Sequence, residues 1–302
     1  MHLSLGSFAA LGTAFAWTFT SVVFEYAAKR IGSLALNFLR LVVAFLFLGI
    51  YGLLSRGLFI PIDAPASAWL WLSASGLVGF VIGDLCLFQA YIDIGARLSL
   101  LVYATTPIFT AILGFIAFGE RLSVIGILGM AVTLGSIALV LSGKKGGDER
   151  HESSSRVRGL LLALGGALGQ AGGLVLGKIG AGYGSDAMDP FAGTQARVVA
   201  GMLGFALVVA VTRSWSGLGA ALKDWKALVS LSAGAFFGPF LGVSLSLLAV
   251  QSGNTGVASA IMSITPILII APSALFFKEK VTLREIIGSV AAVGGVFLLF
   301  LA

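Results

Sequence analysis

Asp84 is the residue of this sequence with the clearest capacity for chemistry, because it is the only carboxylate well inside one of the apolar stretches. In a membrane interior an ionised carboxylate is costly unless it is paired or hydrated, with values from about 3 to above 10 kcal/mol. Asp84 could therefore bind and release a proton, or it could be the counter-ion of an ammonium group on a solute. The structural alternative is an ion pair with Arg40 or Arg97.

Further polar and aromatic residues are expected at a similar depth. A buried tryptophan or tyrosine needs a hydrogen-bond partner, which a water-filled cavity supplies. Pro107 and Pro266 each remove a backbone hydrogen bond and could leave a carbonyl facing a cavity, unless the adjacent threonine satisfies it. Helix packing and kinks alone are the alternative. We predict that one central cavity binds a substrate through Trp17, Asp84, Tyr103, Thr106, Gln170, Ser244 and Thr265.

Metal, disulfide and nucleotide chemistry are not indicated. Cys86 is the only cysteine, and His2 and His151 lie in polar segments, so neither a disulfide nor a metal cluster is predicted. Gly172–Lys178 superficially fits a phosphate-binding loop, but Ile179 replaces the required serine or threonine and no strand precedes it. We expect no catalytic residue, no metal site and no cofactor.

The elements that must position these residues are membrane-spanning helices. Of the 302 residues, 58% are hydrophobic and 11% are charged, whereas soluble domains are about 25% charged. Glycines recur every four residues within 165–177 and 234–242, which predicts close helix contacts. Asp189 followed by Pro190 predicts a helix start.

The apolar windows predict ten transmembrane helices, at about 20 residues per crossing. They lie near residues 4–27, 34–54, 68–91, 96–118, 123–141, 159–180, 190–211, 227–250, 256–277 and 283–301.

Four charged residues near the ends of these segments have matching places in the two halves of the chain. Arg40 and Arg197 lie about two turns inside the second and seventh segments, and we expect their long side chains to reach the headgroup region, with Glu25 as the partner of Arg40. Glu120 and Glu279 close the fourth and ninth segments. They either pair at the membrane interface or take part in gating.

The two halves of the chain are similar in sequence. A single constant shift, without gaps, places Thr106-Pro107-Ile108 on Thr265-Pro266-Ile267 and Glu120 on Glu279. The polar stretch between the halves predicts one five-helix module at residues 1–141, a linker at 142–158 and a second module at 159–302. Because five is odd, the second module begins on the opposite side of the membrane. The predicted fold class is an all-α integral membrane protein, in which ten transmembrane helices form two inverted five-helix repeats around a central cavity.

The sequence resembles EamA-type members of the drug/metabolite transporter (DMT) superfamily. Gln170 stands where the first module has Trp17, and Lys278 stands in place of a glycine, so a symmetric pocket is not expected. The resemblance implies transport of small organic metabolites, and the chain is similar to bacterial amino-acid exporters. It rests on Trp17–Ser21, Arg40, Gly76–Ala90, Thr106-Pro107, Gly119-Glu120-Arg121, Thr265-Pro266 and Lys278-Glu279-Lys280.

These observations predict a secondary transporter that moves amino acids or similar zwitterionic or aromatic solutes by alternating access, with export favoured. A polyanion would demand several buried basic residues. The alternatives are a membrane-embedded enzyme, for which no nucleophile and base converge, and a passive channel or facilitator. The expected partners are a small-molecule solute and the lipid bilayer, without nucleic acid. Proton coupling and the choice between monomer and homodimer stay open.

The basic residues also predict an orientation. The odd-numbered connections hold 14 of them and the even-numbered connections hold three. The positive-inside rule then puts the odd connections in the cytoplasm and both termini outside, whereas the family resemblance implies cytoplasmic termini. We expect a multi-pass protein of the bacterial inner membrane.

Overall fold

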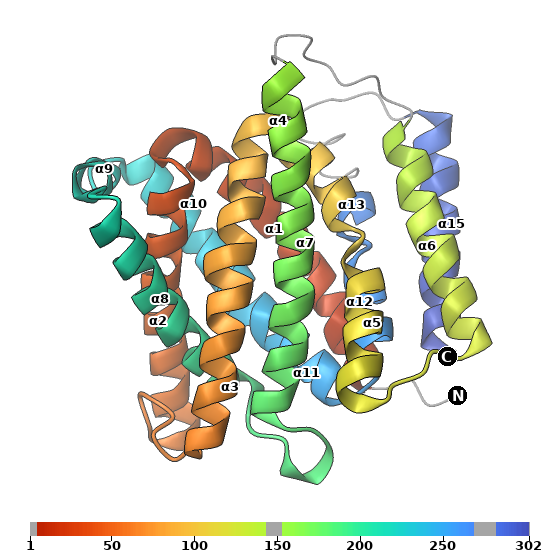
Figure 1. The fold of residues 1–302 in the computed structure, drawn as a ribbon, viewed down its shortest axis with the longest axis horizontal. Helices are drawn as coiled ribbons and strands as arrows, with labels where there is room; N and C mark the ends of the chain where they lie inside the picture. The colour runs from red at the N-terminus through yellow and green to blue at the C-terminus, as the bar shows by residue number, and fades with distance from the viewer. Residues whose placement is uncertain (1–4, 143–152, 269–281, 302) are drawn as a thin grey trace.

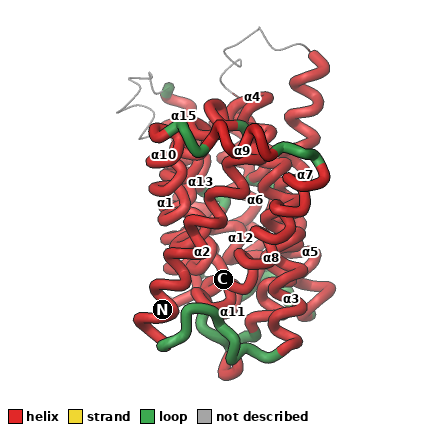
Figure 2. Tube along the Cα trace, turned by 90° about the vertical axis from the view of Figure 1, so that its left-hand side faces the viewer, coloured by secondary structure: helices red, strands yellow, loops and turns green. Residues whose placement is uncertain are grey.

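Helices form every regular element of the computed structural model, which describes residues 5–142, 153–268 and 282–301 (Figure 1). Figure 2 shows the helices along one common direction, with most loops gathered at the two ends of the bundle. Six helices in the described part of the chain are long and apolar enough to cross a membrane, and three shorter apolar helices accompany them. This confirms the predicted all-α membrane fold class, with the ninth predicted segment continuing into residues outside the described ones.

The first module contains the helices that precede residue 143. The third and fourth predicted segments meet at Gly95, whose φ of 79° turns the chain within α4. The elements are α1 (Leu5–Ile31), α2 (Ser33–Arg56), α3 (Ala66–Gly76), the π-helical stretch η1 (Leu77–Asp84), α4 (Leu85–Tyr103), α5 (Thr106–Phe118) and α6 (Val124–Ser142).

The second module begins with α7 (Ser153–Ala181), so helix already forms at residues 153–158, which the sequence predicted as linker. Serine is common at helix N-termini, which suits this earlier start. Asp189 accepts a hydrogen bond from the Ala192 amide at 2.8 Å, which confirms the predicted helix start at Pro190. The remaining elements are η2 (Gly184–Asp186), α8 (Pro190–Val211), α9 (Trp215–Ala221), α10 (Trp225–Ala235), the π-helical stretch η3 (Phe236–Gly242), α11 (Val243–Gln251), α12 (Thr255–Met262), α13 (Thr265–Leu268) and α15 (Leu283–Phe300).

The irregular places of the two modules also repeat. The π-helical stretches begin at Leu77 and at Phe236, which the sequence shift between the halves superposes. Both modules break a helix just before a Thr-Pro pair, where proline supplies no amide for the helix ladder. In each module the threonine hydroxyl donates to the carbonyl three residues earlier, from Thr106 to Tyr103 at 2.5 Å and from Thr265 to Met262 at 2.9 Å. The sequence repeat is therefore a structural repeat down to single hydrogen bonds.

The two modules run in opposite directions through the bundle. In Figure 1, α1 begins at the lower end and α7 begins at the upper end, while the described chain also finishes at the lower end after α15. Equivalent helices of the two modules are therefore antiparallel, which confirms the predicted inversion. Of the connections that the structure describes, those between α1 and α2 and between α8 and α10 lie at the upper end. Those between α2 and α3, α5 and α6, α7 and α8, and α11 and α12 lie at the lower end.

The glycines spaced four residues apart permit close contact between α7 and η1, as predicted. A Cβ atom on Gly169 would lie 2.4 Å from the Cα atom of Gly83, and one on Gly173 would lie 3.0 Å from the Cα atom of Gly79. The Ser75 hydroxyl donates to the Gly173 carbonyl at 2.6 Å. Backbone therefore packs on backbone between the first helix of one module and the third helical segment of the other.

Substituting Gly169 with alanine is expected to lower the free energy of unfolding by about 1–3 kcal/mol or more, because the new methyl group meets backbone that has no room to shift. Chemical unfolding of the purified protein measures this change. Gly135→Ala is the matched control, since a Cβ atom there meets nothing within 4 Å. Equal stability of the two variants would contradict the close α7–η1 packing.

Candidate functional site

A cavity lies in the centre of the bundle, between the two modules. The empty space among its side chains, which includes the open solvent at its mouth, is about 810 Å³. Both modules line it: α1 and η1 from the first, and α7, η3 and α12 from the second. Its walls are therefore shared between the two repeats, as the predicted central site requires.

Six of the seven predicted binding residues line this cavity. Ser244 is the exception: it is fully buried, and its hydroxyl donates to the Phe240 carbonyl at 2.6 Å, so the helix itself uses the polar group. The structure thus brings the predicted residues of both modules together, and their contact with a substrate stays a prediction. The six are Trp17, Asp84, Tyr103, Thr106, Gln170 and Thr265.

Asp84 and Arg40 form an ion pair in the cavity wall. The Arg40 Nη2 donates to the Asp84 Oδ2 at 2.5 Å, and its Nε donates to the Asn37 Oδ1 at 3.0 Å. The expectation that Arg40 reaches the headgroup region beside Glu25 is wrong: the Arg40 side chain is 3% exposed, and Glu25 pairs with Lys29 instead. A buried guanidinium needs a buried partner, and Asp84 at the end of η1 is the carboxylate within reach.

Phenylalanine rings surround the Arg40 guanidinium. Its central carbon lies 4.8 Å from the ring centroid of Phe88 and 5.7 Å from those of Phe24 and Phe80. These distances fit cation–π contacts, which strengthen when water is excluded. All three rings also line the cavity, so the ion pair sits at an aromatic wall.

The sequence reasoning did not identify these phenylalanines. One signal was present: Trp17, Thr20, Ser21 and Phe24 follow the i, i+3, i+4, i+7 spacing of one helix face, and all four line the cavity. Phe80 and Phe88 lie in a segment whose apolar residues cover every side of the helix. Periodicity therefore does not show which face of that helix lines the cavity.

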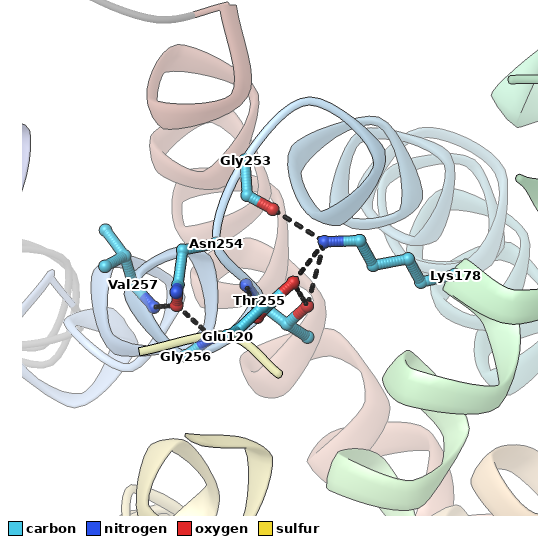
Figure 3. Close-up of polar contacts among 7 residues, drawn as sticks. All are labelled: Glu120, Lys178, Gly253, Asn254, Thr255, Gly256 and Val257. Carbon is cyan, nitrogen blue, oxygen red and sulfur yellow. Dashed lines mark hydrogen bonds and ion pairs between the residues drawn. The ribbon is translucent and has the colours of Figure 1, made fainter. Parts of the chain in front are cut away.

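A second polar cluster joins the end of α7 to the chain after α5 and to the start of α12 (Figure 3). The end of α7 lies at the lower end of the bundle in Figure 1. The Lys178 Nζ at the end of α7 donates to the Glu120 Oε1 at 2.5 Å, to the Gly253 carbonyl at 2.8 Å and to the Thr255 Oγ1 at 3.2 Å. The Glu120 Oε2 accepts the Thr255 amide at 2.7 Å. We call Glu120, Lys178, Gly253 and Thr255 the lower clamp.

The lower clamp connects the modules just below the cavity. Glu120 follows α5 of the first module, whereas Lys178 and Thr255 belong to the second. Lys178 lies one helical turn, about 6 Å, beyond the cavity residue Leu174. The clamp therefore ties the two halves together between the cavity and the end where both termini lie. Its repeat counterpart Glu279 lies outside the described residues.

An ion pair between the modules at the upper end is more exposed than the one in the lower clamp. The Arg30 Nε donates to the Asp224 Oδ2 at 2.8 Å, and Asp224 also accepts the Ala227 amide at 3.1 Å as the cap of α10. The hydrogen bond from Arg30 lowers the pKa of the Asp224 carboxyl. This pair is solvent-exposed, and such pairs contribute little to stability. The more deeply buried of these two ion pairs is therefore the one in the lower clamp.

Among the residues that the structure describes, no group of three or more histidine, cysteine, aspartate or glutamate side chains could hold a metal ion. The cavity instead offers one ion pair, aromatic rings and a few hydroxyl and amide groups. This arrangement can bind a small solute through charge and ring contacts.

Comparisons with known proteins agree with this architecture. No curated protein matches the sequence. A crystal structure of a protein superposes with a TM-score of 0.72 at 17% identity, covering 98% of this chain and 96% of that chain, which shows a shared fold. The model of the EamA-like transporter family matches residues 4–142 and again residues 157–301. Since these two matches cover almost the whole sequence, the chain belongs to the EamA-like transporter family.

Proposed function

We propose that this membrane transporter is a secondary transporter that moves amino acids, or similar zwitterionic or aromatic solutes, through the central cavity. The observation that carries the proposal is the Arg40–Asp84 pair in an aromatic wall of a cavity lined by both modules. An ammonium group of a solute can approach Asp84, and an apolar or aromatic side chain can pack on the rings.

Transport by alternating access is the proposed mechanism. Exchanging the conformations of two inverted modules moves the opening of a central site from one side of the membrane to the other. The lower clamp supports this proposal, since it is a contact between modules that an exchange would have to break. The helix breaks at the two Thr-Pro pairs supply places where the helices beside the cavity can bend.

The proposed direction is export from the cytoplasm, and the proposed location is a bacterial inner membrane. Among the described connections, those between α1 and α2 and between α8 and α10 lie at the upper end, opposite the lower clamp, and have Lys29, Arg30, Arg213 and Lys223 in or beside them. If that end faces the cytoplasm, the clamp closes the outer side, and the cavity can load from within the cell. Coupling to protons through Asp84 is part of the proposal.

A passive facilitator is the second candidate, and flux against a gradient separates the two. A transporter coupled to protons accumulates solute when a proton gradient is imposed, whereas a facilitator only equalises concentrations. A membrane-embedded enzyme would need a nucleophile beside a free base. In the cavity lining, Asp84 pairs with Arg40, and the Ser21 and Thr106 hydroxyls donate to helix carbonyls instead.

Purified protein in proteoliposomes is expected to move amino acids of a test panel, with aromatic ones preferred. Trp17→Ala is expected to raise KM about tenfold, equivalent to about 1.4 kcal/mol, because the indole ring lines the cavity. Trp225→Ala is the matched control, since that ring is 66% exposed at the start of α10. Flux no greater than in empty liposomes for the whole panel would refute the proposed solute class.

A further inference from the structure

Arg197 in α8 is the repeat counterpart of Arg40 in α2. Each is the eighth residue of its helix, since α2 begins at Ser33 and α8 begins at Pro190. Both guanidinium groups lie against the same ring: the central carbon of Arg40 is 5.7 Å and that of Arg197 is 5.1 Å from the centroid of Phe80. The two positive charges therefore lie close together in the centre of the bundle.

The partners of Arg40 have no chemical equivalents around Arg197. Asn37 and Asp84 accept hydrogen bonds from Arg40. The position that matches Asn37 in the second module is Thr194, three residues before Arg197. The position that matches Asp84 is Val243, since η1 ends at Asp84 and the shift that superposes Leu77 on Phe236 superposes Asp84 on Val243. A valine thus stands where the first module has its carboxylate.

The Arg197 side chain is buried without a hydrogen-bond partner for two of its nitrogens. The residue is 2% exposed, so the expectation that it reaches the headgroup region is wrong. Its Nε and Nη1 atoms have no partner among the described residues, and neither has the Thr194 Oγ1 one turn earlier. A buried guanidinium is stable only when an anion or several acceptors compensate it.

Val243, which stands where a counterpart of Asp84 would be, adjoins the cavity. Val243 and Phe80 both line the cavity, whereas Arg197 and Thr194 lie outside its lining, with Arg197 packed on the far side of the Phe80 wall. A ligand group must therefore pass between Phe80 and Val243 to reach them. Two arginines and one aspartate lie in this region, and the aspartate pairs with Arg40 alone, so their side chains carry a net positive charge. An anionic group that enters the cavity beside Val243 would complete in the second module the arrangement that Asp84 completes in the first.

We infer that Arg197 and Thr194 form the binding site for the carboxylate group of the solute, at the position where Val243 replaces the counterpart of Asp84. A guanidinium and a hydroxyl are suitable donors for a carboxylate. This inference rests on the proposed function for the identity of the ligand as a solute, and it adds a specificity: the solute must carry a carboxylate, whereas its amide analogue should bind poorly.

Thermal unfolding of the purified full-length protein tests this inference without measuring transport. The probes are phenylalanine and benzoate, compared with phenylalaninamide and benzamide. We expect the two carboxylates to raise the unfolding midpoint of the wild type and to bind at least tenfold more tightly than the amides. Equal stabilisation by carboxylates and amides, or by none of the probes, would overturn the inference.

Two substitutions at Val243 place the test at the proposed position. Val243→Asp supplies the missing carboxylate, so it should pair with Arg197, raise the unfolding midpoint of the ligand-free protein above that of Val243→Asn, and weaken carboxylate binding at least tenfold. Val243→Asn has nearly the same shape without the charge and should bind carboxylates within about threefold of the wild type. Equal carboxylate binding by the two variants would count against the site.

Arg197→Gln gives a further test that does not depend on those variants. Two nitrogens of the Arg197 guanidinium have no hydrogen-bond partner, so replacing this side chain should leave the ligand-free protein folded. The replacement should also remove the preference for carboxylates over amides. A variant that keeps the preference would assign it to Arg40, and one that fails to fold would make Arg197 a structural residue; both overturn the inference. Carboxylate binding without any flux in proteoliposomes would instead retain the site and refute transport of these solutes.

Discussion

Replacing Asp84 with alanine is expected to lower the free energy of unfolding by about 3–5 kcal/mol and to abolish solute flux. The substitution leaves the Arg40 guanidinium, 3% exposed, without its carboxylate partner, and an uncompensated buried charge is strongly destabilising. Chemical unfolding of the purified protein measures the first effect, and uptake by proteoliposomes measures the second.

A double variant separates the structural role of Asp84 from its role in binding. Arg40→Met together with Asp84→Leu removes both charges, so its stability should return to within about 1 kcal/mol of the wild type. Its flux should remain lost, because both residues line the cavity. A double variant as unstable as Asp84→Ala would contradict the ion-pair explanation, and one that transports normally would remove the pair from the solute site.

An exposed ion pair provides the matched control. Arg56 and Asp63 pair at the lower end of the bundle, where the Asp63 side chain is about half exposed. Asp63→Ala removes a carboxylate from an arginine just as Asp84→Ala does, but water solvates the arginine that remains. Its effect on the free energy of unfolding is therefore expected to be at most about 1 kcal/mol, with flux unchanged.

Breaking the lower clamp is expected to open the cavity toward the end where the termini lie. Glu120→Ala removes the acceptor of both Lys178 and the Thr255 amide, which hold α5 on α7 and α12. A cysteine introduced at cavity residue Thr106, in a Cys86→Ser background, should then react at least tenfold faster with a water-soluble thiol reagent applied from that side. Directed uptake should fall, because one side no longer closes.

Two further variants make this test specific. Glu120→Lys combined with Lys178→Glu restores opposite charges and should slow the labelling again, although incompletely, because a lysine cannot accept the Thr255 amide. Lys29→Ala breaks the exposed Glu25–Lys29 pair at the other end and should leave the labelling rate unchanged. An unchanged rate in Glu120→Ala would mean that the clamp does not close the cavity.

The sequence alone determined the membrane architecture, because the rules for crossing a membrane apply to each segment separately. Hydrocarbon excludes charge and requires each crossing segment to satisfy its own backbone, so apolar length and turn residues mark the helices. The constant shift between the halves likewise predicted the repeat, and the odd number of segments in each half predicted its inversion. Local cues such as Asp189 before Pro190 also had the expected result, since a cap depends only on neighbouring residues.

The sequence also indicated six of the residues that line the cavity, because a polar or aromatic side chain at mid-depth in an apolar segment has few favourable places. It did not identify the partners of these residues. Both Glu25 and Asp84 were plausible partners of Arg40, and only the packing of η1 on α2 selected Asp84. Phe80 and Phe88 were indistinguishable from the apolar residues around them.

Tertiary structure alone decided the contacts between segments distant in the chain. The lower clamp joins Glu120, Lys178 and Thr255 across 135 residues of sequence, and Arg197 is buried behind the ring of Phe80 instead of reaching the headgroups. In a chain whose helices are apolar on most faces, many pairings bury similar surfaces, so periodicity along one helix cannot identify its neighbour. Close packing of all the helices at once makes that choice, and it determines which charges meet a partner and which remain available to a ligand.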